Sequence, residues 1–217
     1  MTISYSGESM YVNCPSSFNR KYNLKEVVKN PPTRETAPAM FRGTDLHNSI
    51  EDFLLNKRND LPKEIKAYND FCIGIRTLGA VPELEFAFDA NWESVKFDDP
   101  IAEIRGFMDA VLVGTELIVY EWKTGKRYDE HSKQRSLYGL AALLMNPDYQ
   151  KVRVITVYLD QQDLDETTYH KHMLVTYKWM WGRRINGTKP PQIYPMRPSW
   201  KCRFCGFSKN QGGKCPN

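Results

Sequence analysis

Long apolar runs are missing from this sequence. No stretch approaches the roughly 18 residues that a membrane span needs, and the opening Met-Thr-Ile-Ser-Tyr-Ser lacks the charged-then-apolar pattern of a signal peptide. Internal repeats and low-complexity tracts are missing as well. We therefore expect a globular cytoplasmic protein without a membrane partner.

A strong charge of one sign is also missing. The 30 Lys and Arg exceed the 26 Asp and Glu by a formal net charge of only +4. This excess is compatible with a polyanionic partner but does not indicate one, because many enzymes that bind no nucleic acid are equally basic. With 217 residues, of which 41% are hydrophobic, the chain can bury a real core, and we expect one domain over residues 1–217.

An even number of cysteines is missing too. There are five of them, and without a secretory signal this weighs against a disulfide framework. Cys202, Cys205 and Cys215 crowd the end of the chain, where free thiols could bind a metal, so residues 195–217 are predicted to form a metal-binding tail. Zinc and [4Fe–4S] sites usually take four ligands. Cys72 is interpreted as a buried helical residue, because free cysteine is commonly a small core hydrophobe.

Apolar periodicity predicts helices and strands in alternation. Residues 1–30 are predicted to form a partly helical N-terminal arm that ends before Pro31-Pro32. The expected helices cover residues 39–56, 62–77, 134–145 and 179–184. The expected strands cover residues 84–88, 105–113, 117–124, 152–159 and 167–177. Together they predict an α/β fold in which a mixed sheet is flanked by helices.

Two apolar strands separated only by Gly114-Thr115-Glu116 predict a hairpin. If Val113 faces Leu117, Asp109 lies opposite Glu121, and opposed Cβ atoms are about 4.5–5.5 Å apart. Lys123 projects from the same side of its strand as Glu121. The hairpin is thus expected to gather two carboxylates and an ammonium group.

Two carboxylates this close repel each other unless a cation lies between them. A hard ion such as Mg²⁺ suits oxygen ligands and retains waters that a substrate phosphate can replace. A metal-activated water could then attack a phosphodiester, while Lys123 orients that water or stabilises the growing charge. By itself the motif is weak, because a surface hairpin with cross-strand ion pairs has the same pattern.

Further motifs give the sequence a clear resemblance to the RecB-like nucleases of the PD-(D/E)XK superfamily. The match begins at Ser4-Tyr5-Ser6 and covers almost the whole chain. It continues through the segments Cys14-Pro15-Ser16-Ser17-Phe18-Asn19-Arg20-Lys21-Tyr22, Gly43-Thr44-Asp45-Leu46-His47-Asn48-Ser49-Ile50-Glu51, Gly106-Phe107-Met108-Asp109, Glu121-Trp122-Lys123-Thr124-Gly125 and Gln134-Arg135-Ser136-Leu137-Tyr138. The resemblance implies a restriction-endonuclease-like core.

The resemblance also implies roles for single residues. His47 would be a third metal ligand beside Asp109 and Glu121, and because imidazole binds Mn²⁺ well, Mn²⁺ could replace Mg²⁺. The remaining implied residues would orient these groups or touch DNA; they are Glu51, Glu85, Gln134 and Tyr138. For Gln134 and Tyr138, which share a helix face, a polar helix edge packed on the sheet remains an alternative.

The tail resembles that of the iron–sulfur members of the group, among them CRISPR adaptation nucleases and AddB-type subunits, while other relatives are phage exonucleases. The resemblance nominates Cys14 as the fourth ligand, beside Cys202, Cys205 and Cys215. A [4Fe–4S] cluster is favoured, and structural Zn²⁺ remains the alternative. Basic and aromatic residues here suit a path for single-stranded DNA. For any one of these residues, a solvated basic surface with packed aromatic side chains is the better explanation.

The predicted function is a Mg²⁺- or Mn²⁺-dependent deoxyribonuclease, an exonuclease on single-stranded or frayed DNA ends. Replication, recombination, repair and CRISPR adaptation, in a phage or a cell, are the settings such a chain suits. A helicase, an integrase, a single-strand-binding protein or further copies of the chain are candidate partners. An inactive DNA-binding or assembly module and a zinc-ribbon interaction protein are the competing hypotheses.

Overall fold

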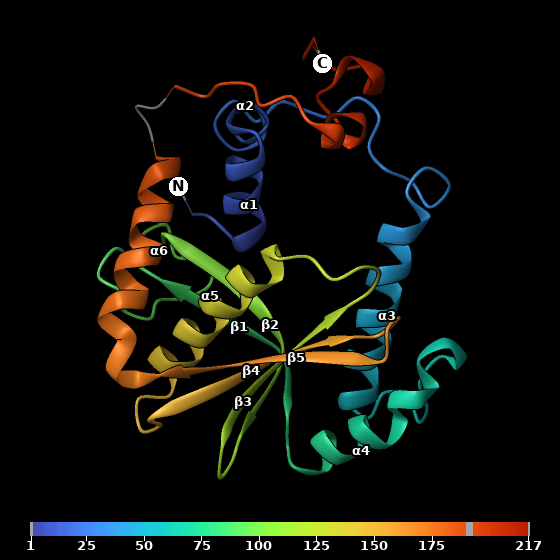
Figure 1. Ribbon diagram of the computed structural model, residues 1–217, viewed down its shortest axis with the longest axis vertical. Coiled ribbons are helices and arrows are strands. Elements are labelled where there is room, and N and C mark those ends of the chain that lie inside the picture. The colour runs from blue at the N-terminus through green and yellow to red at the C-terminus, as the bar shows by residue number, and fades with distance from the viewer. Residues whose placement is uncertain (1, 190–192, 217) are drawn as a thin grey trace.

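The computed structural model describes residues 2–189 and 193–216, so the outermost residues of the predicted arm and tail lie outside it. Five strands form one sheet in the order β1-β2-β3-β4-β5, in which β3 and β4 run parallel and the other neighbours antiparallel (Figure 1). The strands are β1 Val81–Phe88, β2 Ile104–Val113, β3 Leu117–Lys123, β4 Lys151–Tyr158 and β5 Asp163–His170. The parallel pair is joined by a helical crossover, as parallel strands require.

Helices cover both faces of this sheet (Figure 1). Helix α5, the crossover, lies on one face with α6 beside it, while α3 and α4 lie against the other face. The helices are α1 Tyr5–Asn13, α2 Pro15–Phe18, α3 Pro38–Leu54, α4 Asn69–Thr77, α5 Glu130–Met145 and α6 Leu174–Thr188. The predicted mixed sheet flanked by helices is confirmed.

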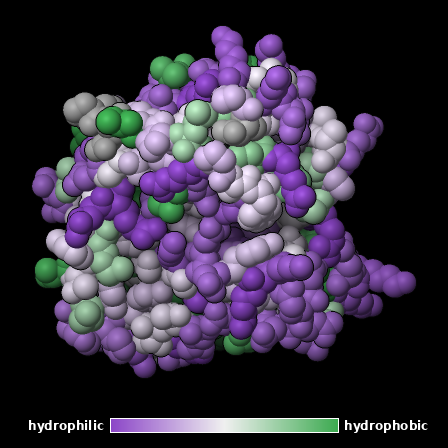
Figure 2. Space-filling model, turned by 45° about the horizontal axis from the view of Figure 1, so that its top comes forward, coloured by the Kyte–Doolittle hydropathy of each residue, from purple (hydrophilic) through white to green (hydrophobic). Residues whose placement is uncertain are grey.

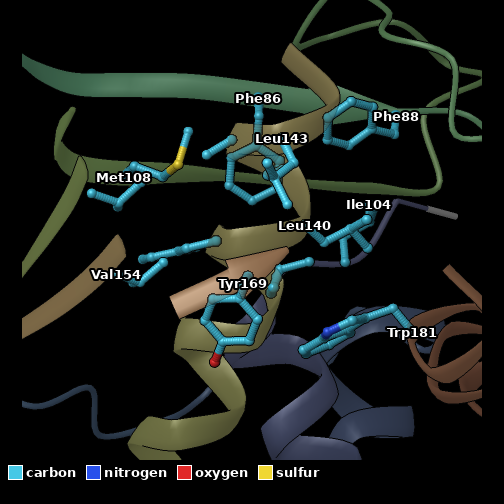
Figure 3. Close-up of a cluster of buried hydrophobic side chains, with 14 of the residues drawn as sticks. Phe86, Phe88, Ile104, Met108, Leu140, Leu143, Val154, Tyr169 and Trp181 are labelled. Atoms are coloured by element: carbon cyan, nitrogen blue, oxygen red, sulfur yellow. The ribbon is translucent and has the colours of Figure 1, made fainter. Parts of the chain in front are cut away.

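The core on the α5 face is built on the second half of α5, residues 137–145, which is apolar nearly all round. Leu137, Leu140 and Leu143 of α5 are at most 1% exposed and meet side chains from the sheet such as Met108 and Val154 (Figure 3). Burial on this scale contributes about 1.5–3 kcal/mol for each large aliphatic side chain. Since α5 follows β3 directly in the chain, this core fixes the helix against the end of the hairpin.

The second core joins α3 and α4 to the opposite face. Leu46, Ile50 and Phe53 recur at helical spacing on α3 and are at most 2% exposed. They belong to the same cluster as Trp122 of β3. The position of α3 over the hairpin is therefore set by apolar packing that surrounds His47.

The two ends of the chain meet at one end of the sheet. The backbone N–H of Ser16 donates to the carbonyl of Pro195 at 3.2 Å, and Arg197 Nη1 donates to the Val12 carbonyl at 2.7 Å. In Figure 1 the C-terminal segment lies beside α2. The N-terminal arm and the C-terminal tail thus form one local unit.

Two predicted elements were wrong in type or position. The strand predicted over 167–177 is instead β5, which starts at Asp163 and ends at His170, and helix α6 begins at Leu174 rather than near residue 179. Strand β5 is the edge of the sheet and mostly solvated, so it shows no apolar alternation. Trp181 and Ile185, one turn apart, bury the inner side of α6.

Hydrophilic side chains predominate on the face shown in Figure 2, and hydrophobic side chains are scattered over it. Within residues 2–189 and 193–216, no helix is both long and apolar enough to cross a bilayer.

Candidate active site

The two carboxylates of the hairpin lie where its ladder ends. Val113 pairs with Leu117 and Ala110 with Tyr120, which is the predicted register; the ladder ends there, and its continuation by one residue would set Asp109 opposite Glu121. At this point the Asp109 side chain replaces a backbone acceptor, because the Trp122 backbone N–H donates to Asp109 Oδ2 at 2.7 Å. The carboxylate of Asp109 is therefore fixed at the edge of β3.

In strand β2, the alternation of side chains between the two faces of the sheet is interrupted near Asp109. Met108 and Val111 both pack in the α5 core, although strict alternation would place them on opposite faces. On the neighbouring strand, Glu83 stands at the register position facing Asp109, and its φ of +47° is unusual for a residue with a Cβ. The distortion of both strands coincides with the carboxylates, as is common for backbone strain near functional sites.

His47 reaches Asp109 from the other layer. Its Nδ1 lies 3.4 Å from Asp109 Oδ2. Burial lowers the pKa of His47, but the carboxylates of Asp109 and Glu121 outweigh it and hold the pKa above its ordinary value. Helix α3 thus brings an imidazole to the two hairpin carboxylates, as the resemblance implied.

Glu121 is the most enclosed group of the site, at 3% exposure. Its Oε1 forms an ion pair with Lys123 and accepts a hydrogen bond of 2.8 Å from Gln134 Nε2. Its Oε2 is buried and, within the described part of the chain, accepts no hydrogen bond. A buried carboxylate oxygen without a donor costs free energy unless a ligand supplies the positive partner.

The carboxyl pKa values at the site are raised, which shows an excess of negative charge that a bound cation would neutralise. Burial and the repulsion from Asp109 raise the pKa of Glu121. Burial and the charges of Asp109 and Glu51 raise the pKa of Glu83 to about 7. Burial lowers the pKa of Lys123, yet Glu121 and Asp109 outweigh it and keep the pKa above its ordinary value. Lys123 is therefore an ammonium group, suited to orienting water or stabilising negative charge.

A divalent cation fits these residues. Two carboxylates and an imidazole form a donor set that Mg²⁺ or Mn²⁺ accepts, and Glu121 Oε2 has an open acceptor position. Among the residues that the structure describes, no three His, Cys, Asp or Glu side chains are already arranged closely enough to hold a metal ion. Binding would therefore draw Asp109, Glu121 and His47 together.

The other predicted site residues lie around this centre. Gln134 contacts Glu121 rather than Lys123, and its Nε2 also donates to the Tyr138 hydroxyl at 2.8 Å. Glu85 is exposed and stands opposite Phe107. For Glu51, the residues that the structure describes show no hydrogen bond to His47, and its charge acts on Glu83.

The resemblance pointed to Glu83 and Glu85 as acidic strand residues, of which Glu85 was taken as the candidate, and His131 was given no role; the structure places Glu83 and His131 next to the site. Glu83 joins the row of Asp109 and Glu121 only through the pairing of β1 with β2, for which no short-range pattern exists. His131 Nδ1 lies 3.0 Å from the Tyr158 hydroxyl. Burial and the nearby charge of Lys123 lower the pKa of His131 to about 4, so the ring is neutral at pH 7.

A second feature lies where the chain ends meet. Cys14 of the arm and Cys202, Cys205 and Cys215 of the tail all line one cavity of about 280 Å³. Cys72 lies elsewhere, fully buried in the α3–α4 core. The four cysteines that the resemblance groups therefore border one space, but in the part of the chain that the structure describes no three of them are close enough together to hold a metal ion.

Several basic and aromatic residues of the C-terminal third have structural partners instead of an open surface. Trp181 is 1% exposed, so it cannot stack on a base. Arg184 pairs with the buried Glu8 at 2.9 Å, and Lys201 pairs with Glu130 at 3.1 Å. Trp200 is exposed.

The sheet, the crossover helix and the Asp109–Glu121–Lys123 hairpin define a restriction-endonuclease-like α/β domain. The family model described as PD-(D/E)XK nuclease superfamily matches residues 72–209, more than half of the chain. The chain belongs to the PD-(D/E)XK nuclease superfamily.

A solved structure shares this fold. The structure named SSO0001 has a TM-score of 0.55 at 21% identity, over 99% of this chain and 86% of that one. A Eubacterium rectale protein named "Putative exonuclease" has a TM-score of 0.48 at 11% identity, over 94% of this chain and 85% of that one. No curated protein sequence matches the chain.

Proposed function

We propose that this chain is a metal-dependent deoxyribonuclease of the RecB-like branch that hydrolyses phosphodiesters at single-stranded or frayed DNA ends. The observation that carries the proposal is the buried Oε2 of Glu121, which has no hydrogen-bond partner among residues 2–189 and 193–216 and lies near Asp109 and His47. A DNA-binding module without activity has no need of a carboxylate pair whose electrostatics favour a cation.

Each side chain then has one task. Asp109, Glu121 and His47 hold Mg²⁺ or Mn²⁺, which when bound supplies a water of lowered pKa and neutralises phosphate charge. Lys123 donates hydrogen bonds to the attacking water and to the phosphate oxygens, which its charged state allows. Gln134 holds the side chain of Glu121 in place.

The cysteine cavity supports a structural metal centre. We infer a [4Fe–4S] cluster ligated by Cys14, Cys202, Cys205 and Cys215, with Zn²⁺ as the alternative. The support is that all four thiols line one cavity between arm and tail. Its role would be to hold the chain ends together, because a cross-link between residues 14 and 202 restricts a very long loop of the unfolded chain.

The test is cleavage of end-labelled single- and double-stranded DNA with Mg²⁺ or Mn²⁺ by the wild type and by Lys123→Ala. Metal-dependent cutting that falls by two orders of magnitude or more in the variant supports the nuclease, and the label released first gives the polarity. The matched control is Lys133→Ala on the exposed side of α5, which should cut like the wild type.

The competing function is an inactive DNA-binding or assembly module on the same fold. It would be favoured if metal-loaded wild-type protein bound DNA but cut neither substrate. Cutting that survives Lys123→Ala would instead place the active centre elsewhere or identify a contaminant. The proposal also includes a partner for the chain, which the cleavage assay does not test. The candidates are a helicase, an integrase, a single-strand-binding protein and further copies of the chain.

A further inference from the structure

A cavity of about 520 Å³ opens directly beside the catalytic carboxylates. Its walls include Asp109 and Glu121 at one end and Tyr138 of α5. Its remaining wall contains three residues to which neither the hairpin motif nor the metal site assigns a task, Phe97, Arg105 and Phe107. The volume lies within the usual range of ligand pockets, about 300–1,000 Å³.

The aromatic wall of this cavity is open to solvent. Phe107 is 42% exposed, although it lies in a central strand of the sheet. The ring of Phe97 lies 4.6 Å from the ring of Phe107, centroid to centroid, at an interplanar angle of 45°. A large apolar side chain left exposed at the wall of a cavity beside catalytic groups is a candidate contact surface.

This wall is held rigidly from behind. The guanidinium of Arg105 lies over the Phe97 ring, with Cζ 4.8 Å from its centroid, and Nη1 donates to the Phe97 carbonyl at 3.0 Å. Between Arg105 and Phe107, the strand approaches Phe86 so closely that a Cβ at Gly106 would lie 2.9 Å from that ring. The backbone that carries Phe107 is therefore fixed, and the guanidinium adds positive charge to the wall.

We propose that Phe107, supported by Phe97 and Arg105, stacks on the base next to the scissile phosphate and selects an unpaired strand. The inference rests on the proposed deoxyribonuclease function. An aromatic ring can stack only on a base whose face is free, which a base inside a duplex does not offer. Stacking tolerates any sequence, because every base has such a face.

The test uses single-stranded oligonucleotides in which one abasic residue is moved along the strand near the cleaved end. The wild type should lose on the order of tenfold in kcat/KM when the abasic residue falls at the stacking position, since one stacked base is typically worth this factor. Phe107→Ala should cut intact DNA as slowly as the wild type cuts that abasic strand, and should no longer distinguish the two. Phe107→Trp should restore the distinction.

Leu78→Ala is the matched control, because Leu78 is a large exposed side chain, 66% accessible, at the end of α4 and outside the cavity. It should keep both the rate and the discrimination. Thermal unfolding of each variant checks the fold. If Phe107→Ala cuts DNA and still distinguishes the abasic strand as the wild type does, the inference is overturned while the nuclease function stands.

If the wild-type protein cuts no DNA, the stacking proposal can still be tested separately from the nuclease proposal. Binding of the same intact and abasic strands is then measured by fluorescence anisotropy. A preference for the intact strand that disappears in Phe107→Ala supports the stacking wall without any catalysis. Equal binding of both strands by the wild type overturns it.

Discussion

Gln134 of helix α5 donates a hydrogen bond of 2.8 Å from its side-chain amide to Oε1 of Glu121 on strand β3. Both side chains are buried, so water does not compete for this bond. The crossover helix therefore controls the orientation of the carboxylate that we propose to bind the metal. Lys123 shares the same oxygen, and within the described part of the chain Oε2 accepts no hydrogen bond.

Removal of this amide should weaken the metal site. For Gln134→Ala we expect Mn²⁺ affinity or kcat/KM to fall about 10- to 100-fold, the usual effect of losing a group that orients a metal ligand. Isothermal titration with Mn²⁺ and the DNA cleavage assay measure the two quantities. Lys133→Ala, one residue away on the exposed side of α5, serves as the control. Unchanged affinity and rate would leave Gln134 with a packing role alone.

The parts of this site that depend on the local geometry of the hairpin could be predicted from the sequence. The short connection from Val113 to Leu117 fixes the hairpin register, so the facing of Asp109 and Glu121 followed without knowledge of the fold. Glu85 was preferred to Glu83 because the position of Glu83 opposite Asp109 depends on the pairing of β1 with β2, across a long loop. The partner of Gln134 depends on how α5 docks, which packing in the core decides.

The error at β5 has a related cause. Strand assignment from sequence depends on one buried face, but this strand runs along the sheet edge, where Leu164 is 56% exposed. Its polar residues instead form specific pairs. Arg135, 5% exposed, reaches Asp165 of β5 at 2.8 Å. An ion pair between one buried and one partly exposed side chain leaves no periodic pattern in the sequence.

Two helical glycines should respond to alanine in opposite directions. A Cβ at Gly139 of α5 would lie 2.4 Å from the Tyr169 ring, whereas a Cβ at Gly182 of α6 meets no atom within 4 Å. Gly139→Ala should lower the free energy of unfolding by about 1–3 kcal/mol. Gly182→Ala should raise it by up to about 1 kcal/mol, because alanine favours the helix. Urea unfolding measures both, and a stabilised Gly139→Ala would show that α5 lies farther from β5.

Glu83 should make the metal-free protein less stable as pH rises. Its pKa is raised from 4.5 to about 7 on folding, so the folded state binds this proton more tightly than the unfolded state. The free energy of unfolding therefore falls as pH increases from about 4.5 to about 7, and stays low above it. Glu83→Gln cannot ionise and should be more stable than the wild type at pH 8, by on the order of 1 kcal/mol for this half-exposed group.

Urea unfolding in EDTA at pH 4 and at pH 8 checks this expectation. At pH 4 the wild type and Glu83→Gln should coincide, because the carboxyl is protonated in both the folded and the unfolded state. Glu85→Gln, on an exposed neighbour in the same strand, is the matched control and should change neither value by more than about 0.5 kcal/mol. A Glu83→Gln protein that is less stable at pH 8 would show that the carboxylate is compensated by a cation even without added metal.

Cys14 should be required for the metal centre that we propose at the chain ends. It is the only one of the four cavity cysteines that the arm contributes, so Cys14→Ser separates arm from tail while leaving three thiols in place. We expect iron and acid-labile sulfide per protein, or zinc if the alternative holds, to fall to a small fraction of the wild-type content. The control is Cys72→Ala, since burial raises the pKa of Cys72 to about 12 and keeps that thiol protonated and unsuited to ligation.

The same variant should also lose stability. A cross-link that closes a loop this long contributes about 2–4 kcal/mol when it is covalent, so Tm should fall by roughly 4–16 °C. The Ser16–Pro195 and Val12–Arg197 hydrogen bonds also join arm and tail, so the two segments need not separate completely. A Cys14→Ser protein with full metal content and unchanged Tm would mean that the tail holds its metal alone, as a zinc ribbon would, and that the arm is positioned by these hydrogen bonds.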